Sequence, residues 1–527
     1  MERRHFLRSA GLATIGGLAV RGYSSPLMRA LHQKSVAADR VLVIVQLYGG
    51  NDGLNTVIPL DQYGQLAQFR SNVLIPSGQV LPLSGLPATG LHPALGGLQD
   101  MWNDGKLSIV QGVGYPNPDL SHFRSTDIWE SGSDSNVVLN SGWIGRYLAN
   151  EYPNYPMGYP NTTMPDPLAI RIGGPVTVGL QSQGMGMAVA LNNTDDPLDL
   201  TGNIFVDPVT PDCAGSKLDL VRLVQRQTDL YGDVIENAAV LGCNQSTLYP
   251  TGSAPGAKLA NALKIVAQLI CGGLKTRIYW VSMSGFDTHA QQVDSADHAQ
   301  GEHAELLQGL GDAIHAFQDD LNLLGLEDRV IGMTFSEFGR RVMSNGSGGT
   351  DHGWAEPMFL FGTNVIPGML GTNPVIDPNT DWDTNVAMQY DFRSVYAGVL
   401  KDWFCLDQQG VDDVLLNTFQ PLALVDPAGC ISTDVQAANQ VAGLELLQVY
   451  PNPFQERTTA RFLSNGGHVM LQVFTPQGAL VSTVVNRVLP AGEHKADIDL
   501  GPLPTGTYYC RLQNGRAQQV RHLIKVR

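Results

Sequence analysis

The chain has 527 residues, of which 43% are hydrophobic and 16% charged, and its formal net charge is −16 at pH 7. This composition excludes a disordered chain, which combines low hydrophobicity with high charge, and the acidic balance excludes a basic duplex-binding face, so we expect no nucleic-acid partner. Residues 1–40 carry seven Lys or Arg and two acids, and residues 444–527 carry nine and five. The acidic excess therefore lies in the middle, which predicts three segments with separate roles.

Residues 1–38 predict an export signal. A basic start at Arg3 and Arg4 is followed by a weakly apolar run from Ala10 to Val20, which is typical of a leader that is removed on export. The run is too short for a membrane helix, and no other segment reaches the roughly 18 apolar residues required, so we expect no transmembrane anchor. Arg-Arg-x-Phe-Leu at residues 3–7 resembles the twin-arginine signal, which implies that machinery as a partner and passage in a folded state.

Four apolar runs in the middle of the chain predict buried strands, at residues 40–47, 106–115, 276–283 and 329–335. A helical pattern covers about residues 296–324. Strands that alternate with helices predict an α/β fold with a doubly wound, mostly parallel sheet, in residues 39–426. Polar residues follow each strand. They are Asp52, Ser121 with His122, Asp287 with His289, and Glu337, and Asp351 with His352 comes soon after.

The carboxyl ends of parallel strands line the ligand crevice of such a sheet, so these polar clusters are predicted to converge. Carboxylates and imidazoles suit a divalent cation such as zinc, calcium, magnesium or manganese. One such residue alone would be unremarkable in a loop. Several at equivalent strand ends predict a site for one or two divalent ions, whose identity stays open.

Six segments carry a resemblance to the domain-of-unknown-function 1501 family, which is sulfatase-like and part of the alkaline phosphatase superfamily. They are residues 49–55, 121–123, 142–146, 285–289, 336–340 and 349–353. The resemblance covers the chain to about residue 425 and implies a sheet of the alkaline phosphatase type. The implied metal ligands form a good site (Asp287, His289 and His352) and a weaker one (Asp52, Glu337 and Asp351), because Phe338 occupies the place of a usual histidine ligand.

The resemblance implies a metal-dependent hydrolase of sulfate or phosphate esters. Ser121, at a predicted helix start, is the nearest match to the nucleophile, and His122 is the expected acid or base. Arg124 and Arg340 are expected to stabilise charge on the transferred group, although surface ion pairing explains either arginine equally well. The alternative is a non-catalytic surface protein that binds a glycan or a partner, which Phe338 favours. A third hypothesis is a metal-stabilised part of a surface assembly.

The cysteines of an exported chain meet an oxidising compartment. None of the six belongs to a Cys-x-x-Cys pair, which argues against a thiolate zinc site. Proximity in the sequence predicts the disulfides Cys213–Cys243 and Cys405–Cys430. Cys271 lies in an apolar helical run, so we expect it to be a buried free thiol.

Residues 427–443 predict a linker, and residues 444–527 predict a small all-β, Ig-like sandwich of short strands, among them 469–474, 479–485 and 507–512. Residues 450–453, residues 503–509 and the basic end at 525–527 resemble the sorting domain of the type IX secretion system. The resemblance implies that machinery as a partner, transit through the periplasm, and delivery to the cell surface or the medium. A generic appended Ig-like module is the alternative.

Overall fold

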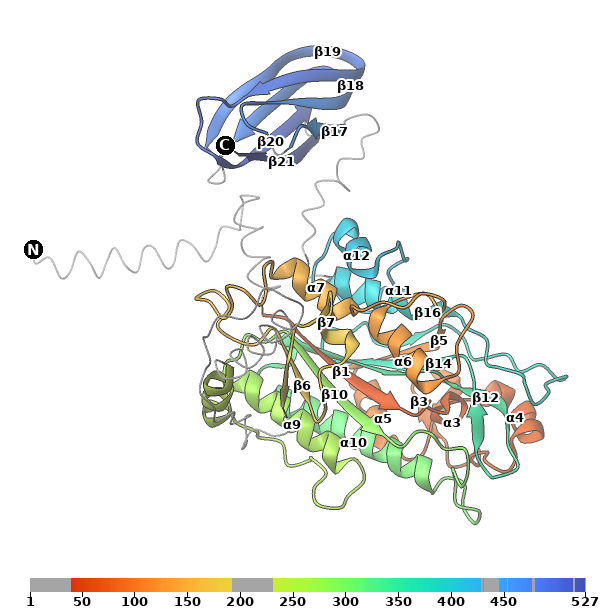
Figure 1. The fold of residues 1–527 in the computed structure, drawn as a ribbon. Helices are drawn as coiled ribbons and strands as arrows, with labels where there is room; N and C mark the ends of the chain where they lie inside the picture. Colours follow the sequence, from red (N-terminus) through yellow and green to blue (C-terminus); the bar gives the residue numbers. More distant parts are fainter. Residues whose placement is uncertain are drawn as a thin grey trace, which may run out of the picture. The chain divides into compact units, whose positions relative to one another are not determined.

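The computed structural model describes residues 39–191, 231–427, 430, 445–452, 454–475, 479–514 and 517–526. The predicted signal at 1–38, nearly all of the predicted linker and Cys213 lie outside these residues. The chain divides into two compact units between residues 430 and 431, and Figure 1 shows the helices and strands of each.

The first unit is built on a nine-stranded sheet in the order β15-β5-β14-β11-β1-β10-β6-β9, with β16 also paired to β5. β14 runs antiparallel to both of its neighbours, and the other pairs in this sheet are parallel. The predicted mostly parallel sheet is therefore confirmed. The strands are β1 Val41–Tyr48, β5 Leu107–Gly114, β6 Ala169–Ile172, β9 Val189–Leu191, β10 Ile278–Ser284, β11 Val330–Ser336, β14 Glu356–Phe361, β15 Gly368–Leu370 and β16 Tyr390–Asp391.

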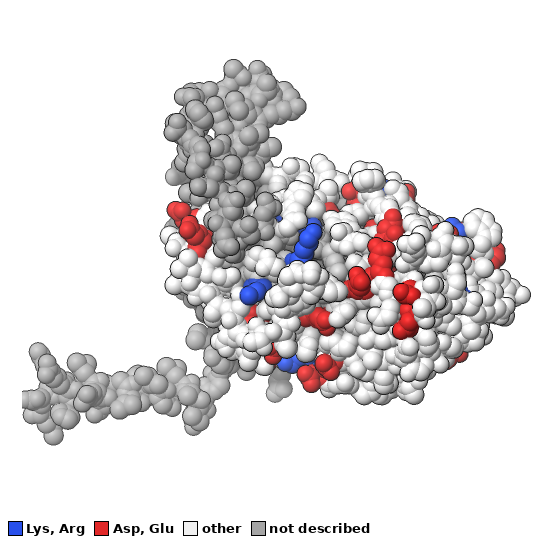
Figure 2. All heavy atoms as spheres, turned by 90° about the horizontal axis from the view of Figure 1, so that it is seen from below, with Lys and Arg blue, Asp and Glu red and all other residues white. Residues whose placement is uncertain are grey.

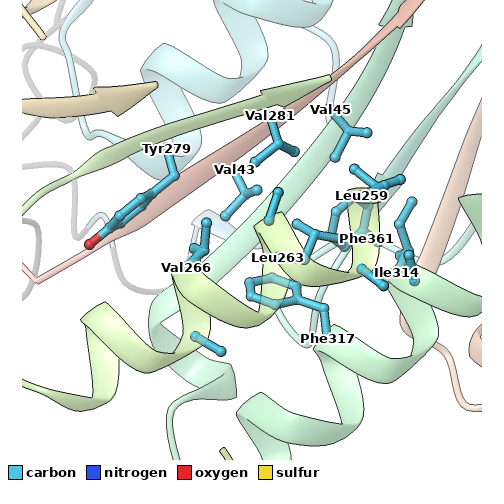
Figure 3. Packing of buried hydrophobic residues seen from close by; sticks show 14 of the residues in the cluster. Val43, Val45, Leu259, Leu263, Val266, Tyr279, Val281, Ile314, Phe317 and Phe361 are labelled. Atoms are coloured by element: carbon cyan, nitrogen blue, oxygen red, sulfur yellow. The ribbon is translucent and has the colours of Figure 1, made fainter. Parts of the chain in front are cut away.

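Helices cover both faces of this sheet, because alternate side chains of its buried strands point to opposite faces. Val43 and Val45 of β1 pack with α5 Gly96–Asn103, α9 Ala257–Cys271 and α10 Glu302–Leu323. Figure 3 shows this core between the sheet and the helices α9 and α10. Leu42 and Ile44 pack on the other face. The helices there are α6 His122–Ser131, α7 Trp143–Glu151, α11 Phe392–Gly398 and α12 Gln408–Leu415. The doubly wound arrangement follows from strands that are apolar on both faces.

The four predicted strands agree with β1, β5, β10 and β11 within two residues at each end. The predicted helix 296–324 begins later, at Glu302, because residues 297–300 form a turn closed by the Gln300 N–H and the Asp297 carbonyl (2.9 Å). The smaller elements lie around the sheet. They are α3 Gly53–Thr56, β2 Val57–Pro59, η1 Leu60–Gln62, α4 Tyr63–Phe69, β3 Leu81–Leu83, β4 Leu86–Leu91, η2 Val178–Leu180, β7 Gln181–Ser182, β8 Met185–Gly186, a helix at 231–241, η3 Glu327–Arg329, β12 Arg340–Ser344, β13 Thr350–His352 and η4 Val399–Trp403.

The cysteines agree with the sequence in part. Cys405 and Cys430 form the predicted disulfide. Cys271 was expected to be buried and alone, but it is half-exposed and its sulfur lies 2.7 Å from that of Cys243. The apolar face of α9 turns toward the sheet, and Cys271 stands at the last position of the helix, where the chain leaves the core.

The second unit is a five-stranded antiparallel sheet that encloses its own core, which confirms the predicted all-β unit. Its strands are β17 Glu445–Tyr450, β18 Arg457–Phe474, β19 Leu480–Asp499, β20 Gly506–Asn514 and β21 Ala517–Lys525. β18 pairs with β19 along its length. On its other edge it pairs first with β17 and then with β20.

The surface of the first unit agrees with the acidic composition. Figure 2 shows one face, on which acidic side chains are more frequent than basic ones and most of the area is uncharged. Among the described residues, no helix combines the length and the apolar character needed to cross a bilayer.

Candidate metal centre

Three neighbouring strands end at the same edge of the sheet. β1 lies between β10 and β11, and its last residues pair with the last residues of both, Tyr48 with Ser284 and Leu47 with Ser336. The loops that follow these strands therefore start side by side. Gly49 lets the loop after β1 lie directly against the loop after β10, since a Cβ on Gly49 would be 2.2 Å from the backbone nitrogen of Asp287.

His122, Asp287 and His352 form a group whose potential ligand atoms all lie within 4.8 Å of one another. Within the described part of the chain it is the one group of three or more such residues. His122 is the first residue of α6, Asp287 follows β10, and His352 ends β13. The structure thus brings together Asp287 and His352, which were predicted to converge, and adds His122, which was expected to act as an acid or base.

Each imidazole near this group is held by an acceptor at its Nδ1. Nδ1 of His122 lies 2.7 Å from Oε1 of Glu337, which also accepts the Gly49 N–H (2.8 Å). Nδ1 of His352 lies 2.9 Å from the Leu120 carbonyl, and Nδ1 of His289 lies 3.1 Å from Oδ1 of Asp351. Because these partners accept, Nδ1 carries the proton and the lone pair of each neutral ring is on Nε2.

The three Nε2 atoms all face Asp287. They lie 3.5 Å (His122), 3.2 Å (His289) and 3.3 Å (His352) from its carboxylate oxygens. Nε2 of His289 is also 2.9 Å from Nε2 of His352, although His289 is not part of the group of three. Such an arrangement, with Nε2 toward the centre and Nδ1 toward an outer acceptor, is common to histidine ligands of metals.

The protonation states suit a cation. Burial raises the pKa of Asp287, but the hydrogen bond from Arg340, the contact with His352 and the charge of Arg340 outweigh it, so the pKa is lowered. Burial lowers the pKa of His352, which favours its neutral form. A carboxylate and a neutral imidazole are the forms that bind a metal.

Glu337 and Asp351, both predicted as ligands, contact the imidazoles instead. Glu337 is buried and binds His122, while Asp351 is half-exposed and binds His289. Burial raises the pKa of Asp351, but its hydrogen bonds with Asn345 and His289 outweigh this, so the pKa is lowered. Both carboxylates therefore hold imidazoles whose Nε2 atoms face Asp287.

Asp52, the third residue of the predicted weaker site, is fully buried and binds Arg70 and Gln292 (2.6 Å). Burial raises its pKa, but the charge of Arg70 and its other partners outweigh this and the pKa is lowered. Oε1 of the Gln292 side chain accepts from the hydroxyls of Thr288 (3.2 Å) and Thr350 (2.8 Å), which lie beside Asp287 and Asp351 in the chain. Asp52 thus belongs to a buried network beneath the loops that carry the site.

The two arginines have different positions. Arg340 is buried and donates to Asp287 (2.8 Å) and to the carbonyls of residues 49, 50, 286 and 350, so it joins the loops of the site. Arg124 donates to the carbonyls of residues 134, 135 and 137, on the loop that follows α6. The partners of both guanidinium groups are thus mainly backbone carbonyls.

Ser121 is exposed and stands between Leu120 and His122 in the chain. The Leu120 carbonyl accepts a hydrogen bond from His352, and His122 is part of the group of three. It is the N-cap residue of α6, as predicted, and its hydroxyl makes no capping hydrogen bond. Phe338 is buried with its ring centroid 5.0 Å from that of His122 and 4.3 Å from that of His352. Phe338 therefore packs against two of the imidazoles that face Asp287.

The sequence did not indicate the direction in which His122 points, nor the role of Glu356. His122 was expected to act on a leaving group, but it faces the same centre as Asp287 and His352. Glu356 is buried beside Glu337, accepts the Ser336 N–H (2.6 Å), and has a pKa raised well above its ordinary value, by burial first and then by Glu337. Glu356 begins the buried strand β14, and no motif in the sequence indicated that its carboxyl group lies beside Glu337.

Family models match a segment in each of the two parts of the chain. Residues 220–415 match the model of a family described as a protein of unknown function (DUF1501), and residues 448–526 match the secretion system C-terminal sorting domain. The sorting domain directs the chain to the cell surface or the medium. No curated protein matches the chain significantly.

Several solved structures align with most of the chain at low similarity. One, from Bacteroides thetaiotaomicron, belongs to a locus for metabolism of multiple glycosaminoglycans (10% identity, 84% of this chain and 89% of that chain, TM-score 0.34). A protein in the alkaline phosphatase superfamily from Vibrio parahaemolyticus has 11% identity over 86% and 82% (TM-score 0.29). The PsFucS1 sulfatase from Pseudoalteromonas sp. has 11% over 89% and 88% (TM-score 0.30). These scores are too low to transfer residue roles.

Proposed function

We propose that this chain, a secreted protein with a DUF1501 segment and a C-terminal sorting domain, is a divalent-metal hydrolase of sulfate or phosphate esters. The ligands in this proposal are His122, Asp287 and His352, with His289 as a fourth. Glu337 and Asp351 hold two of the imidazoles from the second layer.

One observation supports the metal above all others. Nε2 of His289 and Nε2 of His352 are 2.9 Å apart, and both lone pairs point inward because both Nδ1 atoms face acceptors. Two lone pairs at this distance repel each other unless a cation or a proton lies between them. The nearby carboxylate of Asp287 adds the negative charge that favours a divalent ion.

The chemistry of the proposal uses residues beside this centre. A divalent cation there would supply Lewis-acid polarisation of an ester oxygen. The hydroxyl of Ser121 is the proposed nucleophile, because it is exposed, lies next to His122 and makes no capping hydrogen bond. The first N–H groups of α6 lack acceptors within the helix, so they would stabilise an anionic oxygen placed at the start of the helix. They take the role first expected of Arg124 and Arg340.

Metal content is the first test. Protein purified without chelator is analysed by elemental mass spectrometry, and we expect a tightly held divalent ion in each chain. Asp287→Asn should lower the occupancy about tenfold or more, while His468→Ala, an exposed histidine of the second unit, should leave it unchanged. A chain that stays free of metal after incubation with zinc, manganese, magnesium and calcium salts would contradict the proposal.

Hydrolysis is tested on the metal-loaded protein with aryl phosphate and aryl sulfate monoesters. We expect turnover that Asp287→Asn abolishes together with the metal and that Ser121→Ala abolishes with the metal retained. Turnover that persists in both variants would show that the activity belongs elsewhere. A metal-loaded protein with no turnover on either ester would remove the catalytic part of the proposal and leave the metal site.

A second candidate function is supported by exposed aromatic side chains near the same centre. Phe123 (89% exposed) follows His122, and Trp354 (43%) is two residues after His352. Trp382 is 71% exposed and is linked to His352 through Arg341. The Arg341 guanidinium donates to the Trp382 carbonyl (2.9 Å) and to the His352 carbonyl (3.2 Å). Large exposed aromatics are typical of binding surfaces, so this candidate is a non-catalytic protein that binds a glycan.

The two functions differ in what Trp382 does. For the binding protein, Trp382→Ala should weaken binding to a glycan array about tenfold, with metal content unchanged and no ester turnover in any variant. Leu480→Ala, another exposed apolar residue in the second unit, is the matched control. Equal glycan binding by Trp382→Ala and by the unaltered chain would exclude this candidate.

A further inference from the structure

Two cysteines outside the metal centre lie in contact. The sulfur of Cys243 is 2.7 Å from the sulfur of Cys271, and neither residue takes part in a disulfide in the structure. Atoms that are not bonded settle at about 3.5–4 Å even when both are carbons, which are smaller than sulfur. The contact is therefore too close for two separate thiols and approaches the distance of a covalent bond.

The backbone around both cysteines is held in this position by other contacts. Gly242 and Gly272 flank the pair, and a Cβ on Gly242 would lie 2.1 Å from the Gln268 carbonyl oxygen. The Gln268 side chain donates to the Ala239 carbonyl (2.8 Å). The end of the helix at 231–241 and the end of α9 thus touch through glycine, and the sulfurs face each other as a result.

The segment after Cys243 is fixed just as firmly. The Asn244 side chain donates to the Lys264 carbonyl of α9 (3.0 Å) and to Asp320 of α10 (2.7 Å). The N–H groups of Gln245 and Ser246 donate to the same Asp320 carboxylate (2.6 and 3.0 Å). Such anchoring on both sides lowers the entropy lost when a cross-link closes.

We propose that Cys243 and Cys271 form a second disulfide in the secreted protein, which joins the end of the helix at 231–241 to the end of α9. Each thiol loses one proton and one electron as the S–S bond forms. A dithiol–disulfide oxidoreductase, or another small disulfide, accepts both electrons and both protons and leaves as two thiols. The exposure of Cys243 and the half-exposure of Cys271 give that partner access to the folded chain.

Peptide mapping of the full chain tests the pairing. The protein is equilibrated with oxidised glutathione, its free thiols are alkylated in denaturant, and it is digested with trypsin without reduction. Cleavage after Lys217, Lys258 and Lys264 places Cys213, Cys243 and Cys271 on three different peptides. The Cys405–Cys430 disulfide serves as the internal standard of oxidation.

We expect the peptide with Cys243 to be cross-linked to the peptide with Cys271, two hydrogens lighter than the free pair. Alkylation of both cysteines while Cys405–Cys430 is intact would overturn the proposal. A link between Cys243 and Cys213 would overturn it as well, in favour of the pairing that sequence proximity predicts.

A cycle of variants gives a second readout. Cys243→Ser and Cys271→Ser should each lower the Tm of the oxidised protein by about 3–6 °C, and the double variant should lower it no further, because the same bond is lost. In reduced protein the three variants should match the unaltered chain. Additive shifts, or equal shifts in reduced protein, would show that packing of the thiols and not a bond is responsible.

Discussion

His122 is oriented by a carboxylate that lies outside the group of three. Oε1 of Glu337 is buried and accepts both Nδ1–H of His122 and the N–H of Gly49. A neutral amide in its place would hold the ring less firmly and would leave Nε2 a weaker ligand. In the proposed metal site, Glu337 would therefore influence the affinity for the ion without contacting it.

We expect Glu337→Gln to weaken metal affinity about 10–100-fold with little change in folding. A competition titration against a chromophoric chelator measures the affinity, and Trp fluorescence measures unfolding, because all seven tryptophans lie within residues 102–403 of the first unit. Glu302→Gln, an exposed acid at the start of α10, is the control. Equal affinity in both variants would contradict the role given to Glu337.

Two other histidines are buried behind the site. Burial lowers the pKa of His92 to about 3 and that of His303 to about 4. Nδ1 of His92 accepts the Ala94 N–H (3.1 Å), and Nε2 of His303 donates to Asn51 (3.0 Å). Both rings are therefore neutral in the folded chain over most of the accessible pH range.

This burial makes stability depend on pH. Below about pH 6.5 the unfolded chain protonates His92 and the folded chain does not, so the unfolded state binds more protons and stability falls as the pH is lowered toward 3. We expect His92→Asn, which keeps an acceptor for Ala94, to reduce the slope of the unfolding free energy by about 1.4 kcal/mol per pH unit between pH 6 and pH 4. Urea unfolding followed by Trp fluorescence measures it. His468→Asn, at an exposed histidine of the second unit, should leave the slope unchanged. An unchanged slope in His92→Asn would refute the assignment.

At the scale of elements, the centre of the sheet depends on the pairing of a glycine with an aromatic residue. Gly332 of β11 pairs with Phe361 of β14, and a Cβ on Gly332 would lie 2.0 Å from that ring. The ring covers the strand where the glycine has no side chain. β14 is the one antiparallel strand in this sheet, and this contact lies where it joins the parallel strands.

We expect Gly332→Ala to lower the unfolding free energy by about 1–3 kcal/mol, because the buried strands cannot move apart to admit a methyl group. Gly64→Ala is the matched control, since that glycine lies in α4 and a Cβ there meets nothing within 4 Å. It should raise stability by up to about 1 kcal/mol. Similar losses in both variants would mean that the contact with Phe361 does not decide the cost.

At the scale of the whole molecule, the two units have separate hydrophobic cores, and the candidate ligands all belong to the first. The last strand of the second unit, β21, ends with Lys525, a buried lysine whose ammonium group donates to the carbonyls of Leu500, Gly501 and Leu503 (2.6–2.8 Å). Metal binding should therefore stabilise one unit and leave the other unchanged.

We expect EDTA to lower the Tm of the first unit by several degrees, measured by Trp fluorescence, and to leave unfolding of the second unit unchanged in calorimetry. His352→Ala should unfold at the lower temperature with or without EDTA. A first unit whose Tm is the same with and without chelator, in protein shown to contain metal, would mean that the ion adds nothing to stability.

The sequence by itself determined the α/β class, the four central strands and the all-β end, because buried strands and turn residues leave local patterns. It also placed the polar residues at strand ends, where a parallel sheet gathers them. Only the tertiary structure decided which of them meet. His122 turns inward because Glu337 holds its Nδ1, Asp52 turns away because Arg70 and Gln292 bind it, and Cys243 meets Cys271 because two glycines let their helices touch. Each of these outcomes depends on partners far away in the chain, which no local pattern specifies.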